Sequence, residues 1–170
     1  MKKIIITIIT IILLAFFSVS AIAQTENTDT GAKILAAMTI TESADMHFGT
    51  MTVPSTFAEV DLAVGGTVSI ANGTLNLLAQ APTSHAAAYN ITGDANATYR
   101  ITLPTNGSVS LTDGFSQIQV KDFVCSYGGL ITTLDGTGNS SFTVGATIQL
   151  GMSQPAGIYS GTFDVSVSYY

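Results

Sequence analysis

The sequence is poor in charge, lacks tryptophan and contains a single cysteine. Only 9% of its 170 residues are charged. These are too few to cover the outer faces of exposed helices, and no stretch after residue 23 keeps a helical period. We therefore expect a chain that is nearly all β. Because Cys125 has no second cysteine to pair with, no intramolecular disulfide can form, and packing alone must stabilise the fold. We interpret Cys125 as a buried thiol that acts as a small apolar side chain.

Basic residues are also scarce. Two of the five Lys and Arg residues lie within the first three positions, which leaves Lys33, Arg100 and Lys121 against 11 acidic residues. The net charge of residues 24–170 is therefore 3 − 11 = −8 with histidine neutral. Binding to nucleic acid or to an anionic membrane needs clustered Lys and Arg side chains. We exclude both as partners.

The combinations of residues that most catalytic and metal sites require are missing as well. The chain has two histidines, His47 and His85, no G-x-S-x-G motif and no Cys/His cluster, which argues against a serine hydrolase or a zinc site. The segment DGTGN at 135–139 lacks the later glutamate of a calcium loop and is interpreted as a turn. Counting leaves open a carboxylate pair for glycoside hydrolysis, although most acidic residues lie beside turns. We expect no enzymatic activity, no cofactor and no metal.

The N-terminus has the three parts of a secretory signal peptide. Lys2 and Lys3 form a positive region, residues 4–17 are apolar, and residues 21–23 (AIA) offer a small-residue cleavage site. The apolar run is shorter than the roughly 20 residues that a transmembrane helix needs. We therefore predict that residues 1–23 are removed. The protein is then exported to the periplasm, the cell surface or the extracellular space, without membrane insertion after cleavage.

The rest of the chain divides into a polar leader and one domain. Residues 24–33 (QTENTDTGAK) have no apolar period and predict a flexible leader, whereas residues 34–170 have the length of a single domain. Glycine-containing pairs, each expected to supply the positive φ of a tight turn, stand at 65–66, 72–73, 93–94, 106–107, 113–114, 128–129 and 135–136. The predicted strands are 34–40 with a continuation at 46–48, 67–71, 75–79, 88–92, 98–103, 108–112, 118–123, 142–150 and 158–169.

The alternation within these strands predicts burial on one face. Tyr99, Ile101 and Leu103 are expected to point inward, with their polar neighbours outward. Short strands of this kind at this spacing are typical of antiparallel sheets that pack face to face. The predicted fold class is an all-β, Ig-like antiparallel β-sandwich, preceded by a cleaved signal peptide.

The last 14 residues, GIYSGTFDVSVSYY, form the best-patterned strand, although most termini fray unless something holds them. One face of an extended chain would carry apolar side chains and the other face Ser, Thr and Asp. We therefore predict an assembly or core strand, whose site residues are Gly157, Tyr159, Phe163, Val165, Val167 and Tyr169.

The order of five segments resembles a known family. The segments are MHFGTM at 46–51, GGTVSI at 65–70, YRITLP at 99–104, FTVGATIQL at 142–150 and the C-terminal GIYSGTFDVSVSYY. Together they are similar to the domain of unknown function 4402 family, which comprises small exported bacterial domains. The resemblance runs from about residue 34 to residue 170. Its name implies no function.

The C-terminal strand also resembles that of chaperone–usher pilins, in which a glycine stands fourteenth from the end and a tyrosine is penultimate. Gly157 and Tyr169 occupy these positions. The resemblance implies a sandwich that lacks one strand and accepts an extended segment from a neighbouring subunit by β-augmentation. Since the leader has no apolar alternation, the donor would be Ile34–Thr41, a segment that the domain also needs as its first strand.

These observations predict an exported, non-enzymatic structural or assembly protein, either pilus-like (fimbrial) or another cell-surface subunit. Its partners would be further copies in a homopolymer or other surface subunits. A self-complete sandwich whose last strand is internal explains the same pattern. The alternative function is therefore a monomeric secreted module that binds a carbohydrate or a surface ligand. Tyr127 and Tyr170 are its candidate stacking platforms.

Overall fold

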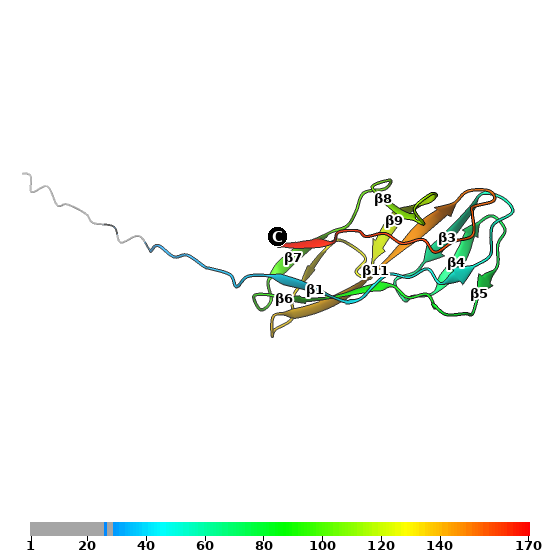
Figure 1. Cartoon of the computed structure of the whole chain (residues 1–170). Coiled ribbons are helices and arrows are strands. Elements are labelled where there is room, and N and C mark those ends of the chain that lie inside the picture. The colour runs from blue at the N-terminus through cyan, green and yellow to red at the C-terminus, as the bar shows by residue number, and fades with distance from the viewer. Residues whose placement is uncertain (1–25, 27–28) are drawn as a thin grey trace, which may run out of the picture. The chain divides into compact units, whose positions relative to one another are not determined.

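The computed structural model describes Glu26 and residues 29–170, and residues 34–170 form one compact unit. The predicted signal peptide, residues 1–23, lies outside the described residues. The described part of the chain has twelve strands and no helix, which confirms the all-β expectation (Figure 1). The strands are β1 (Thr39–Ala44), β2 (Thr50–Met51), β3 (Ala58–Leu62), β4 (Val68–Asn72), β5 (Leu77–Leu78), β6 (Ala87–Thr92), β7 (Thr98–Thr102), β8 (Val109–Thr112), β9 (Gln117–Cys125), β10 (Ile131–Thr133), β11 (Asn139–Leu150) and β12 (Ser166–Tyr169).

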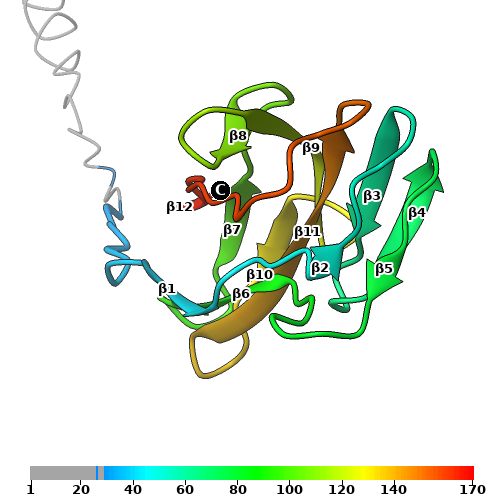
Figure 2. The ribbon, with the colours of Figure 1, turned by 45° about the vertical axis from the view of Figure 1, so that its right-hand side comes forward.

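Strand β11 is the centre of a seven-stranded antiparallel sheet (Figure 2). Along one edge, its first half pairs with β6 as far as Val144, and its second half pairs with β3 from Ala146 onward. Its other edge pairs with β9, which in turn pairs with β8. β1 extends the sheet beyond β6, and β4 extends it beyond β3. Gly145 therefore stands where β11 changes partners.

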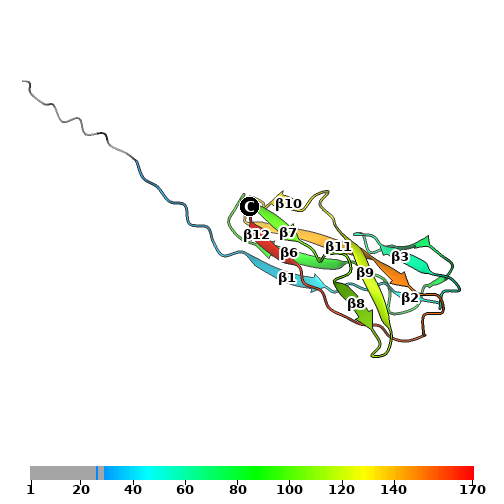
Figure 3. The same ribbon diagram turned by 90° about the horizontal axis from the view of Figure 1, so that it is seen from above.

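A second antiparallel sheet has three strands in the order β10-β7-β12, and β2 and β5 form a separate two-stranded pair. Figure 3 shows β10, β7 and β12 together near the C-terminus. The C-terminal strand thus lies at one edge of this smaller sheet, with β7 as its ladder partner. No helix that could cross a membrane occurs among the residues that the structure describes.

The buried side chains form two clusters. The first cluster is built on β3, β9 and the second half of β11, and contains Phe48, Ala58, Val60, Leu62, Leu75, Val109, Ile118, Val120, Ala146, Ile148 and Leu150. The second cluster joins both sheets and contains Ala87, Tyr89, Ile91, Tyr99, Ile101, Leu134, Phe142 and Val144. Tyr99 and Ile101 are fully buried and Leu103 packs against the second cluster, as the alternation predicts.

The strand predictions at the start of the domain are wrong in three places. The predicted continuation at 46–48 has only an isolated bridge, between His47 and His85. The first strand begins at Thr39 and not at Ile34, because Thr39 lies opposite Thr92, the last residue of β6, and earlier residues find no partner strand. Ile34 is 92% exposed. Strand β3 is absent from the predicted set because its sequence, AEVDL, places two carboxylates between apolar residues. The structure buries its apolar positions and leaves Glu59 and Asp61 on the outer face.

The turn prediction holds for four of the seven glycine pairs, in which Gly66, Gly73, Gly107 and Gly114 have positive φ. At 135–136 the positive φ belongs to Gly138 instead. Gly93 is required for space: a Cβ there would lie 2.7 Å from the Tyr169 hydroxyl oxygen and 2.8 Å from the Leu134 Cδ1. Gly93 therefore serves a close approach, and the positive φ of the turn that follows belongs to Asn96.

Candidate functional site

The C-terminal segment changes partner sheets along its length. Ser160 forms an isolated antiparallel bridge with Thr112 of β8, with N–H to O distances of 3.0 and 2.9 Å. Regular pairing resumes only at Ser166, opposite Thr102 of β7. The predicted strand 158–169 is therefore regular only over β12, because residues 161–165 cross from β8 toward β7 without a ladder partner.

Among the residues that the structure describes, no strand pairs with the outer edge of β12. Ser166, Ser168 and Tyr170 direct their backbone groups toward β7; the Tyr170 N–H donates to the Thr98 carbonyl at 3.0 Å. In an antiparallel ladder alternate residues turn these groups to opposite sides. Val167 and Tyr169 therefore present N–H and C=O groups to the open edge, and no ladder joins this edge to β1, although the two strands touch.

The side chains of this segment follow the predicted alternation. Tyr159, Phe163, Val165, Val167 and Tyr169 are half-buried, and the residues between them are exposed. The Phe163 ring lies 5.2 Å from the Phe123 ring, measured between centroids, and Phe163 packs against both core clusters. The segment 163–169 therefore combines apolar side chains on one face with an open backbone edge, which is the combination that a further strand can extend.

The hydroxyl of Tyr169 fixes two other segments. It donates to the Ala36 carbonyl at 2.7 Å and accepts from the Asp94 N–H at 2.7 Å. These bonds link the end of β12 to the residues before β1 and to the turn between β6 and β7. The penultimate tyrosine is thus an anchor that holds the chain entering β1.

Tyr169→Phe tests this anchor. We expect a loss of about 2 kcal/mol of stability, at about 1 kcal/mol for each of the two hydrogen bonds removed, and faster amide hydrogen exchange over residues 36–40. Tyr170→Phe is the matched control, since Tyr170 is 71% exposed and its ring packs under the Arg100 guanidinium, 4.8 Å from the ring centroid. Equal exchange rates in wild type and in Tyr169→Phe would show that the Tyr169 hydroxyl does not stabilise residues 36–40.

Gly157 and Tyr159 lie upstream, beside the turn that joins β8 to β9. A Cβ on Gly157 would lie 3.0 Å from Asp113 Oδ2, so the chain passes closely over this carboxylate. The N–H groups of Ser116 and Phe115 donate to Asp113 and hold its pKa below the ordinary value. Tyr159 donates its hydroxyl proton to the Pro155 carbonyl at 2.9 Å. Both residues therefore position the start of the segment.

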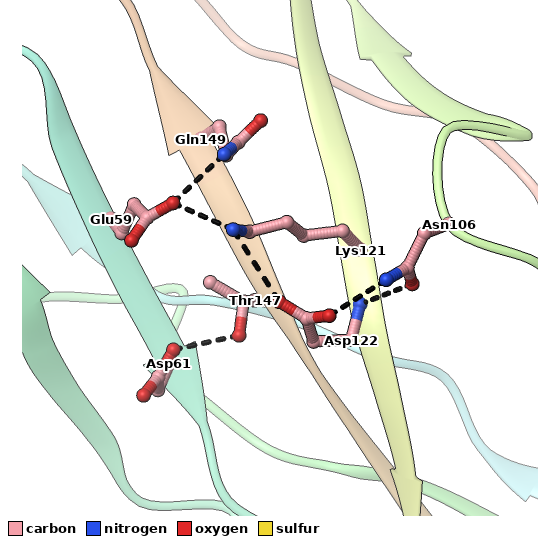
Figure 4. A network of polar contacts seen from close by, with 7 residues as sticks. All are labelled: Glu59, Asp61, Asn106, Lys121, Asp122, Thr147 and Gln149. Carbon is pink, nitrogen blue, oxygen red and sulfur yellow. Dashed lines mark hydrogen bonds and ion pairs between the residues drawn. The ribbon is translucent and has the colours of Figure 1, made fainter.

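A network of polar side chains lies on the outer face of the larger sheet, across β3, β11 and β9 (Figure 4). Lys121 Nζ lies 2.7 Å from Glu59 Oε1, to which the Gln149 amide also donates at 2.8 Å. Both contacts hold the pKa of Glu59 below its ordinary value, the Lys121 contact most, and Glu59 in turn raises the pKa of Lys121. Thr147, which is buried, donates to Asp61 at 2.7 Å. Glu59, Asp61, Lys121 and Thr147 of this network line a shallow depression, together with Ser69, Ala71 and Val124.

A β-bulge places two neighbouring residues of β9 on that same face. The ladder with β11 shifts by one residue between Gly145 and Thr147, and Asp122 has a positive φ of 50°. Lys121 and Asp122 therefore both point outward, whereas Val120 is buried. The Asn106 side chain locks the bulge: its amide donates to Asp122 Oδ1 and its oxygen accepts from the Asp122 N–H, both at 2.7 Å.

The two histidines lie side by side at a third place. Reciprocal backbone bonds of 2.9 Å join His47 to His85, and the ring centroids are 5.9 Å apart. His85 Nε2 lies 2.7 Å from Asp45 Oδ1, and its Nδ1 lies 3.1 Å from the Thr83 carbonyl oxygen. Acceptors at both ring nitrogens favour the doubly protonated ring, so the pKa of His85 is raised and that of Asp45 is lowered.

An NMR titration should place the pKa of His85 above its ordinary value of 6.5. Because this pKa is raised, the stability that the Asp45–His85 pair contributes is complete below about pH 6.5 and is lost as the pH rises through the folded value. On the acid side it is lost as the pH falls below 3.8, through the lowered pKa of Asp45. Asp45→Asn should return the pKa of His85 toward 6.5, and exposed Asp164→Asn should not. An unchanged value in Asp45→Asn would contradict the pairing.

The remaining candidate residues, Tyr127, Cys125 and Asp135, make contacts within their own domain. Tyr127 packs against the second core cluster, and its hydroxyl lies 2.9 Å from Ser140 Oγ and donates to the Ser141 carbonyl at 2.9 Å. Its ring is therefore not a free stacking surface. Cys125 is half-buried against the same cluster and has a free thiol. The Asp135 carboxylate accepts from the N–H groups of Thr137 and Asn139, which closes the turn predicted for 135–139.

The fold and the candidate site define a class: an all-β domain of antiparallel sheets whose last strand lies at an open edge. The particular family follows from comparison with family models, in which the domain of unknown function 4402 matches residues 38–169. The chain belongs to this family, as the order of its five segments predicts. No curated protein and no solved structure gave a significant match.

Proposed function

We propose that this chain is an exported, non-enzymatic structural subunit of a pilus-like or other surface assembly, and that its β12 edge takes up an extended strand. The observation that carries the proposal is the open edge of residues 163–169, with Phe163, Val165, Val167 and Tyr169 half-buried on the core side. Unpaired edges with an apolar face are aggregation hazards in stable monomers, and natural proteins usually protect them.

The strand order gives further support. Strands β1, β6, β11 and β9 lie in the order that the A, B, E and D strands have in an Ig-like sandwich, and β7 and β12 pair as C and F do. The G strand of such a sandwich would lie beside F, at the open edge of β12. None of the described strands occupies that place. An added strand would complete the Ig-like arrangement that we propose.

Four carboxylates serve as structural hydrogen-bond acceptors. A glycosidase needs one carboxylic acid with a raised pKa to protonate the leaving group. The pKa is lowered below its ordinary value for Asp45, Glu59, Asp113 and Asp135. Each of these four accepts hydrogen bonds that favour the ionised form.

The first experiment is size-exclusion chromatography with light scattering on residues 24–170, combined with amide hydrogen exchange. We expect oligomers, or a monomer whose melting temperature rises when an alternating valine/threonine peptide is added. The amides of Val165, Val167 and Tyr169 should exchange fast in the free monomer and slowly once a strand is bound. A stable monomer in which these amides are already protected would contradict the proposal.

The depression on the outer face favours one second candidate function, a monomeric module that binds a carbohydrate. Its lining supplies hydroxyl, ammonium and carboxylate groups, which match the many hydroxyls of a sugar. A glycan array tests this function: binding should be lost in Lys121→Met and retained in Tyr127→Phe. Absence of binding to any glycan would remove this candidate.

A further inference from the structure

We infer that the strand received at the β12 edge belongs to a different protein and not to a second copy of this chain. This inference rests on the proposed function and specifies the partner. It follows from the size and chemistry of the edge, from the pairing of β1, and from the residues that precede β1.

The edge sets the chemistry of its partner. The row from Phe163 to Tyr169 is seven residues long, or about 20 Å at roughly 3.3 Å per residue. Side chains alternate across a strand, so an added strand of that length turns three or four side chains toward the core. These must be apolar, because Phe163, Val165 and Val167 border the place that they would enter. The partner is therefore an extended segment with apolar residues at alternate positions.

The segment Ile34–Thr41 of a second copy cannot supply this strand without loss of β1. Thr39, Ile40 and Thr41 are paired with Thr92, Ile91 and Asn90 of their own β6. Donating these residues to another molecule would break the edge ladder of the larger sheet in the donor. The donor expected from the pilin resemblance is thus already used inside its own domain.

The described residues before β1 are of two kinds. Ile34, Ala36 and Met38 alternate as apolar side chains, but Met38 packs against the second core cluster of its own domain. Residues 29–33 have the wrong chemistry. An extended segment 29–35 would turn either Thr30, Ala32 and Ile34 or Asp29, Gly31, Lys33 and Leu35 toward the core. The first set contains one large apolar side chain, and the second would bury two charges. Ala36 is held in place by the Tyr169 hydroxyl of its own molecule. Residues 24–28 (QTENT) are polar throughout.

Charge also disfavours a second copy. Each chain carries a net charge of 3 − 11 = −8 over residues 24–170, so two copies repel each other at low ionic strength. The exposed face of the segment 163–169 bears Asp164, Ser166 and Ser168. A donor that carries lysine or arginine between its apolar residues would meet this face with complementary charge.

Two peptides separate the sources of the strand. One is the chain's own segment 29–41, and the other alternates valine with threonine and lysine. Both are added to residues 24–170, and amide exchange at Val165 and Val167 is measured together with the melting temperature. We expect the lysine-containing peptide to slow exchange at both amides at least tenfold and the 29–41 peptide to leave exchange unchanged. The paired variant Ile34→Asn/Leu35→Asn should have the oligomeric state of the wild type.

The other outcomes are distinguishable. If the 29–41 peptide protects the edge as well as the lysine-containing peptide does, or if Ile34→Asn/Leu35→Asn dissolves an oligomer, a second copy is the donor. The inference then fails while the proposed function stands. If neither peptide changes exchange and the protein is a monomer, the edge accepts no strand, and both the inference and the proposed function fail.

Discussion

Gly145→Ala is expected to lower the free energy of unfolding by about 3 kcal/mol, toward the upper end for overpacking. At this position a Cβ would overlap with the Leu62 carbonyl oxygen and would lie 3.0 Å from the Ala63 carbonyl carbon. Both neighbours are backbone atoms, which cannot turn away as a side chain can. The chain leaving β3 would have to move off the outer face of β11.

The size of this effect follows from the place of Gly145 in the sheet. β11 pairs with β6 through Val144 and with β3 from Ala146, so both ladders converge at this residue. The opposite edge carries the β9 bulge, where Gly145 pairs with Val124. A displacement at Gly145 therefore disturbs three ladders together, and local relaxation at one edge strains the others.

Thermal unfolding followed by circular dichroism measures this prediction. We expect the melting temperature of Gly145→Ala to fall by about 10 °C for a domain of this size. Gly128→Ala is the matched control, because no atom lies within 4 Å of the added Cβ and its φ is not positive. A melting temperature of Gly145→Ala close to that of Gly128→Ala would show that the chain after β3 has room to move.

Alternation in the sequence predicts which side chains are buried but not which backbone groups are paired. Tyr99 and Ile101 are buried as predicted, and Phe163, Val165 and Val167 face the core side as predicted. A strand paired on both edges and one with an open edge have the same two-residue period. The open edge of β12 therefore depends on the order of strands, which the residues of the C-terminal segment do not encode by themselves.

The polar sheet face could not be predicted for a related reason. Glu59, Lys121 and Gln149 meet only because β3, β11 and β9 are neighbours, although the residues are far apart in the sequence. The bulge adds a further change, since Lys121 and Asp122 point to the same side and alternation would place them on opposite sides. One sequence signal existed: the charged residues in AEVDL and QVKDF interrupt apolar strands, which indicates outward positions but not which strands are neighbours.

Val165→Asp is expected to reduce the affinity of the β12 edge for a complementary strand by roughly 100-fold. When a strand covers the edge, an aspartate at this position loses its water without gaining a partner. A cost of about 3 kcal/mol is moderate for burying such a group, and each 1.4 kcal/mol is about tenfold in affinity. In the free monomer, Val165 is only half-buried, so the variant should remain folded and exported.

Ser166→Asp is the matched control for this charge. It adds the same carboxylate to the next residue of the segment, whose side chain is exposed on the opposite face. Titration with the alternating lysine-containing peptide, followed by calorimetry, should give a dissociation constant within about threefold of wild type for Ser166→Asp. Equal affinities for Val165→Asp and Ser166→Asp would mean that the partner does not cover the apolar face, which would contradict the assembly role that we propose for this edge.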